Sequence, residues 1–143
     1  MNYSRRDLAV LMSAAATAAA AQDKAPAAKL SSKAFPFKDI EAKTTRAGKS
    51  RFVLQGALHQ GFVVNCHITE LTPGESPHPP HHHIHEEIVM LRDGTVDVTV
   101  DGATTRLESG SVWFIASNVE HGMKNVGTTN AIYFVVEFRG DGA

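Results

Sequence analysis

Histidines and acidic residues gather in one segment of this chain, residues 74–94. Within it, His83 lies two positions after His81 and Glu87 lies four positions after His83. Even steps along an extended chain place side chains on one face. A second segment, residues 110–125, contains one further histidine. Imidazole nitrogens and carboxylate oxygens are ordinary ligands for divalent first-row metals. The sequence therefore predicts one metal ion bound by His81, His83, Glu87 and His121.

The other histidines in and before the first segment have different interpretations. His85 has the same strand parity as His83 and Glu87. It can replace one ligand, act at the pocket rim as a proton carrier and candidate catalytic residue, or be an exposed loop histidine. His82 has the opposite parity, so we expect it to be exposed. His78 precedes two prolines and is expected to stay in the loop, whereas His67 follows an apolar run and can face a cavity.

The two segments resemble the paired motifs of the cupin superfamily. The first family motif reads G, five residues, H-x-H, three or four residues, E, six residues, G. His81, His83, Glu87 and Gly94 fit it, but the leading Gly74 is one residue early. The second motif reads G, five residues, P-x-G, two residues, H, three residues, N. Its Gly, His and Asn are present, whereas the proline and glycine are replaced by Ala116 and Asn118. Asn tolerates positive φ, so the turn at Asn118 can survive.

The resemblance spans roughly residues 50–139 and implies a single-domain, all-β jelly-roll barrel that forms a homodimer. It also implies that the four predicted ligands leave coordination positions open for a small-molecule substrate. The metals that suit them are Mn, Fe, Ni, Cu and Zn. Oxygenase, lyase or decarboxylase, and isomerase reactions on a small oxygen-rich molecule remain open, because one barrel hosts many chemistries. The alternatives are a non-enzymatic protein that binds a small ligand or metal, and metal buffering by the histidine loop.

The N-terminus resembles a bacterial twin-arginine export signal. Arg5 and Arg6 stand before an alanine-rich run that ends in an A-x-A site at residues 19–21. That run is too short and too weakly apolar for a stable membrane span. We therefore expect a signal peptide over residues 1–21, a leader or N-terminal arm over residues 22–49, and a barrel domain over residues 50–139. The expected location is the periplasm or another exported compartment.

Composition excludes two classes of partner. The net charge is −1 at pH 7 with no run of basic residues, which argues against nucleic acid and, after signal cleavage, against a membrane surface. The single cysteine, Cys66, cannot form an internal disulfide and is expected to be a small buried apolar residue. Phe35-Pro36-Phe37 is expected to dock on the barrel or on a partner subunit.

From residue 50 onward the chain is predicted to form short strands joined by tight turns. Asp93-Gly94 and Asp101-Gly102 are typical of type I′ hairpins. The expected strands are rich in Val, Ile, Thr and Phe; they span residues 51–55, 62–71, 87–91, 95–100, 104–107, 111–115, 121–125 and 132–138. Glu137 interrupts the last apolar run. We expect it to face solvent at a sheet edge, although an inward orientation would make it a candidate acid or base.

Overall fold

The computed structural model describes residues 27–140 and consists almost entirely of β-strands. The predicted signal peptide over residues 1–21 lies outside the described residues. Within residues 27–140, nine strands follow one short 3-10 helix, η1, Phe37–Asp39. They are β1 Lys43–Thr45, β2 Gly48–Ala57, β3 Val63–Leu71, β4 Glu86–Asp93, β5 Thr95–Val100, β6 Ala103–Glu108, β7 Val112–Ile115, β8 His121–Asn125 and β9 Ala131–Arg139. Residues 27–140 include no helix long and apolar enough to cross a membrane.

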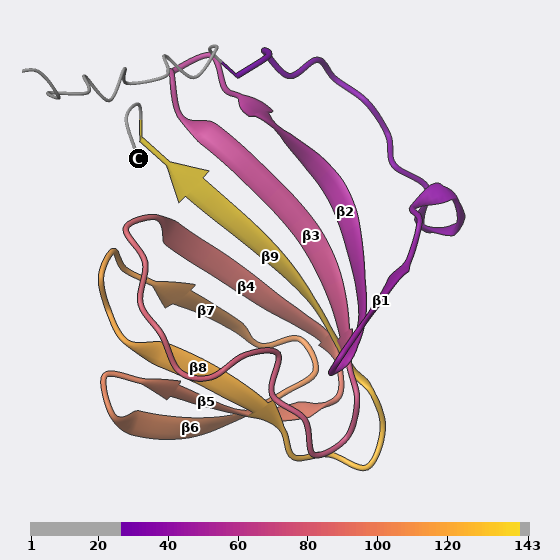
Figure 1. Cartoon of the computed structure of the whole chain (residues 1–143), viewed down its shortest axis with the longest axis vertical. Helices are drawn as coiled ribbons and strands as arrows, with labels where there is room; N and C mark the ends of the chain where they lie inside the picture. Colours follow the sequence, from indigo (N-terminus) through magenta and orange to yellow (C-terminus); the bar gives the residue numbers. More distant parts are fainter. Residues whose placement is uncertain (1–26, 141–143) are drawn as a thin grey trace, which may run out of the picture.

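The strands form two antiparallel sheets that enclose the core (Figure 1). One sheet has the order β1-β2-β3-β9-β4-β7 and the other the order β6-β5-β8. The largest fully buried apolar side chains come from both sheets: Leu71 and Leu91 from the first and Val96 from the second. The all-β jelly-roll fold expected from the sequence is therefore confirmed.

Of the two hairpins predicted at aspartate-glycine pairs, one is confirmed and the other is wrong. Asp101 and Gly102 have φ values of 47° and 78°, and Val100 pairs with Ala103 across them, as a type I′ hairpin requires. At Asp93-Gly94 the hairpin prediction is wrong, because β4 and β5 belong to different sheets. Gly94 has a φ of 103°, and a Cβ atom there would lie 2.7 Å from the Cα of Ala131. This glycine turns the chain from one sheet to the other where there is no space for a side chain.

Strand β9 lies in the middle of the larger sheet, between β3 and β4 (Figure 1). Its partners come from distant parts of the sequence: Asn65 of β3 and Glu87 of β4 both lie opposite Glu137. Side chains of one row share a face of the sheet. The next row contains His67, Val135 and Val89. These rows form one wall of the cavity described below.

Candidate metal centre

The loop between β3 and β4 carries the first histidine segment and passes across the molecule (Figure 1). Backbone hydrogen bonds fix it to the second segment. The N–H groups of His81 and His121 donate to each other's carbonyls at 3.0 and 2.8 Å. The N–H of Asn118 donates to the carbonyl of His83 at 2.7 Å. Asn118 has a φ of 60°, as expected for the residue that replaces the family's glycine.

These backbone contacts bring three histidine rings together. The ring centroids of His81 and His121 are 4.5 Å apart, and those of His83 and His121 are 4.7 Å apart. One nitrogen of each of His81, His83 and His121 lies within 4.8 Å of those of the other two. His121 is only 5% exposed. Such a group could hold one metal ion, and it contains three of the four predicted ligands.

The hydrogen bonds of these rings favour tautomers that leave one ring nitrogen free to bind a metal. Nδ1–H of His83 can donate to the carbonyl of His85 at 2.8 Å, and Nδ1–H of His121 to that of Val119 at 2.9 Å. Both contacts favour the tautomer with an Nε2 lone pair. Among the described residues, no hydrogen-bond partner reaches the buried Nδ1 of His81 or Nε2 of His83. Unpaired buried nitrogens are costly, so the residues present fit a bound metal.

Glu87 approaches the cluster from β4. Its Oε1 lies 3.0 Å from Nε2 of His83 and 3.2 Å from Nε2 of His85. The contact with His83 lacks hydrogen-bond geometry, as expected of two ligand atoms aimed at a common ion. Within residues 27–140, His83, His85 and Glu87 form a second potential metal group that shares His83 with the first. The set of His81, His83, Glu87 and His121 therefore stays a prediction.

His85 is not an exposed loop residue. Its ring stacks on that of His83 with a centroid separation of 3.6 Å and an interplanar angle of 4°. It lines the cavity, whereas its neighbours His82 and Ile84 are exposed. The inward orientation expected for an extended chain therefore holds over residues 81–87, although β4 begins only at Glu86. His85 thus stacks on the histidine cluster and also approaches Glu137, another residue that lines the cavity.

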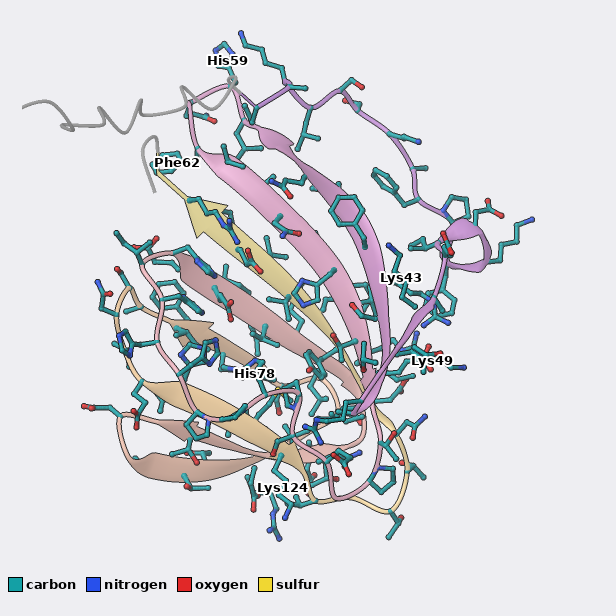
Figure 2. All side chains as sticks on the ribbon, viewed as in Figure 1. Lys43, Lys49, His59, Phe62, His78 and Lys124 are labelled. Carbon is teal, nitrogen blue, oxygen red and sulfur yellow. The ribbon has the colours of Figure 1, made fainter. Side chains whose placement is uncertain are left out.

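A cavity of about 310 Å³ opens beside the histidines. This volume suits a small ligand. Its apolar wall comes from four strands: Val89, Trp113, Ile115, Met123 and Val135. His67 of β3 lines the cavity, as one interpretation of its sequence position predicts. His78 lies on the loop as expected (Figure 2), but its ring also meets that of His81 edge-on at 4.1 Å.

The expectation that Glu137 faces solvent at a sheet edge is wrong. Its strand is central, and Glu137 is 8% exposed and lines the cavity. Its Oε2 accepts hydrogen bonds from Nη2 of Arg139 at 2.7 Å and Nδ2 of Asn65 at 3.5 Å. Nε2 of His85 lies 3.8 Å from the same oxygen. The signal for this position was the single carboxylate in an apolar run.

Burial sets the protonation of several cavity groups. It lowers the pKa of His67, against the opposing effect of Glu137 and Glu87. Burial is also the main cause that lowers the pKa of His81, helped by the neighbouring histidines. Both shifts favour neutral imidazole, the form that binds metal. Burial raises the pKa of Tyr133 to about 12, so its hydroxyl keeps its proton at neutral pH.

The fold and the histidine cluster together define a small jelly-roll protein with a candidate metal site inside its barrel. The sequence model of the cupin domain matches residues 67–137, which include both motifs. The chain belongs to the cupin superfamily. No curated protein sequence matches it.

Solved structures of the same fold are similar to this chain. An RmlC-like cupin from Shewanella frigidimarina is 22% identical with a TM-score of 0.60, and the match covers 78% of this chain and 95% of that one. KdgF from Halomonas is 18% identical with a TM-score of 0.59, covering 78% and 97%. The oxalate decarboxylase of Lactobacillus farciminis, solved as a formate complex, is 17% identical with a TM-score of 0.60, covering 76% and 33%. At these identities the similarity establishes the fold alone.

Proposed function

We propose that this protein is a divalent-metal-dependent enzyme that acts on a small oxygen-rich molecule. One observation carries the proposal: three imidazoles, two of which have an unpaired buried nitrogen, converge at a cavity that also contains His85 and Glu137. A purely structural metal site is closed by its protein ligands. Here a small-ligand cavity and two further polar side chains adjoin the cluster. That arrangement favours catalysis over a structural role.

Each part of the cavity has a role in this proposal. His81, His83, Glu87 and His121 would hold the ion. When bound, the metal supplies Lewis-acid polarisation, water activation or one-electron chemistry with dioxygen, which are the bases of the three reaction classes considered above. His85 carries a proton to or from the substrate, since an imidazole ring can both donate and accept a proton. The apolar wall packs on the carbon skeleton and excludes water.

The metal assignment is tested by elemental analysis of protein purified from its own compartment. We expect about one Mn, Fe, Ni, Cu or Zn per chain, and loss of nearly all of it in the His121→Ala variant. His82→Ala is the matched control, because His82 is an exposed histidine on the same loop. Near-stoichiometric metal in the His121→Ala protein would refute the ligand set.

Catalysis is tested by a substrate screen of the metal-loaded protein with and without oxygen. His85→Gln should keep the fold and the metal but lose about a hundredfold in turnover, the usual effect of removing a general acid or base. Unchanged turnover would exclude His85 from the mechanism, and lost metal would make His85 a ligand. A protein that retains a small molecule without converting any would instead be a binding protein.

We further propose export by the twin-arginine route, motivated by Arg5 and Arg6 before the alanine-rich run. A protein exported after folding can take up Mn or Fe in the cytosol before it meets copper or zinc outside, which otherwise bind more tightly. Replacing both arginines by lysine should leave folded precursor in the cytoplasm. Normal export of that variant would indicate the Sec route.

We also propose that the protein is a homodimer that associates through the outer face of its larger sheet. Apolar side chains of β4, β7 and β9 form a patch there, called the outer patch: Ile88, Met90, Val112, Phe114, Phe134 and Val136. Val112 and Phe114 are 61% and 59% exposed. Continuous exposed apolar surface of this kind marks an interaction site. A second copy covers the patch symmetrically, as in most homo-oligomers.

A further inference from the structure

Glu137 is a buried carboxylate that the predicted ligand set does not use. All its ion pairs and hydrogen bonds with residues 27–140 involve Oε2, which Asn65, Arg139 and His85 approach. A carboxylate can accept several hydrogen bonds through its two oxygens. Its second oxygen, Oε1, is therefore available as an acceptor, and the Glu137 side chain lines the cavity.

The partners of Oε2 also fix the position of this carboxylate. Arg139 and Asn65 hold Glu137 from two directions, and β9 is hydrogen-bonded on both sides. A group held in this way needs little reorganisation when a ligand binds. Arg139, at 2.7 Å, places a positive charge beside this carboxylate, and Glu137 can therefore serve as a hydrogen-bond acceptor inside the cavity.

The distance to the histidine cluster suits a small molecule. Glu137 lies directly opposite Glu87 on the neighbouring strand, and both carboxylates approach the same nitrogen, Nε2 of His85, at 3.8 and 3.2 Å. A ligand of a few carbon atoms that reaches the metal group therefore also reaches Glu137. Its carbon atoms would contact the apolar wall that includes Val89 and Ile115.

The charges of the cavity indicate which chemical group the ligand carries at the end that faces the metal group. Arg139 offsets Glu137, so a divalent ion beside Glu87 leaves one uncompensated positive charge. A buried charge is stabilised by a partner of opposite sign. A single carboxylate on the ligand would provide that partner at the metal group.

We infer that Glu137 is a specificity-determining residue that accepts a hydrogen bond from a substrate hydroxyl, and that the substrate is a small hydroxy-carboxylate. Its carboxylate faces the histidine cluster and its hydroxyl faces Oε1 of Glu137. This inference rests on the proposed metal-binding function and names the substrate class for the same cavity. His85 lies between the two ends of the ligand, where it can reach the atoms between them.

Binding of a matched pair of acids tests the inference without any turnover. The probes are 3-hydroxypropanoate and propanoate, which differ by one hydroxyl, titrated calorimetrically into protein loaded with redox-inert Zn²⁺. We expect the hydroxyl to increase affinity about tenfold or more, as for a hydrogen bond to a charged group. In Glu137→Gln this hydroxyl preference should fall about tenfold, while propanoate affinity and zinc content stay unchanged. Glu108→Gln, an exposed change on β6, is the control.

The change in the difference between the two acids, from wild type to Glu137→Gln, isolates the contact of the hydroxyl with Glu137 from any chelation of the metal. An unchanged hydroxyl preference in Glu137→Gln would overturn the inference. If that variant does not fold, a crystal structure of the wild-type protein with zinc and 3-hydroxypropanoate decides. A hydroxyl oxygen within hydrogen-bond distance of Glu137 supports the inference, and one turned away overturns it. Failure of the proposed function is distinguishable, because the protein would then bind no zinc at His121.

Discussion

At the scale of single residues, burial and charge act against each other on His67. Its imidazole faces a cavity that also contains two carboxylates, Glu87 and Glu137, which favour the protonated form. Burial is the larger influence, so the pKa of His67 lies below its ordinary value of 6.5. At a pH just below 6.5, His67 is therefore neutral in the folded protein but binds a proton in the unfolded chain.

This difference predicts a pH dependence of stability in metal-free protein. As the pH falls below about 6.5, the unfolded state binds the proton that folded His67 does not, so the free energy of unfolding decreases. His67 contributes a slope of at most about 1.4 kcal/mol per pH unit. Urea unfolding with a chelator between about pH 5 and pH 8 measures it. His67→Gln should have the shallower slope, and equal slopes for the two proteins would contradict the prediction.

At the scale of elements, one buried side chain links the strands that carry the site to the loops around them. Asn125 is fully buried at the end of β8. Its Nδ2 donates to the carbonyls of Leu71 and Thr129, both at 2.8 Å, and its Oδ1 accepts from the N–H of Gly127 at 2.9 Å. The three contacts join the end of β3, the end of β8 and the turn before β9. The last residue of the second motif thus has a structural role.

Asn125→Ala should therefore destabilise the fold strongly. The change leaves the carbonyls of Leu71 and Thr129 without the amide that donates to them, and it removes one of the two acceptors of the Gly127 N–H, which also donates to Thr95. Each buried group that loses its partner costs about 1–3 kcal/mol. We expect the free energy of unfolding to fall by about 3 kcal/mol in chemical denaturation. Asn130→Ala, at an exposed position in the same turn, should change it by less than about 0.5 kcal/mol. A similar loss in both variants would show that these side-chain contacts are not the cause.

The elements also show what sequence patterns could predict. Alternation and turn residues located eight strands to within about three residues at each end, because these signals are local. The three-residue β1, Lys43–Thr45, was missed because all its residues are exposed and polar. The order of strands in a sheet depends on distant pairings. For that reason the turn at Gly94 and the position of Glu137 were predicted wrongly.

In the candidate site too, the sequence predicted the features that depend on local spacing and missed those that depend on distant pairings. Motif spacing predicted that His81, His83 and His121 would meet, and the backbone pairing of the two segments brings them together. The position of His85 depends on a loop conformation, and its stacking on His83 was not visible in the spacing. The contacts of Glu137 with Asn65 and His85 required knowledge that β9 lies between β3 and β4.

At the scale of the whole molecule, the two halves of the larger sheet differ on their outer side. Near β2, Phe37 of the N-terminal arm packs on the barrel, with the guanidinium carbons of Arg51 and Arg92 at 4.6 and 5.6 Å from its ring centroid. Arg51 also pairs with Glu70 of β3, and both side chains are largely buried. The docking of the arm on its own barrel is thus confirmed for Phe37. The outer patch on β4, β7 and β9 remains accessible.

The proposed dimer predicts that a charge in the outer patch separates the subunits. A stable interface buries roughly 800 Å² per partner with an apolar centre, where a glutamate would be desolvated without a partner. Phe114→Glu should therefore convert dimer into monomer at micromolar concentration, as measured by analytical ultracentrifugation. Phe52→Glu is the matched control, because Phe52 is 58% exposed but does not lie on the same face as the outer patch. Phe52 pairs with His67 and shares its face of the sheet, which is the face opposite the outer patch. A monomeric wild-type protein, or an intact Phe114→Glu dimer, would contradict the assignment of this face.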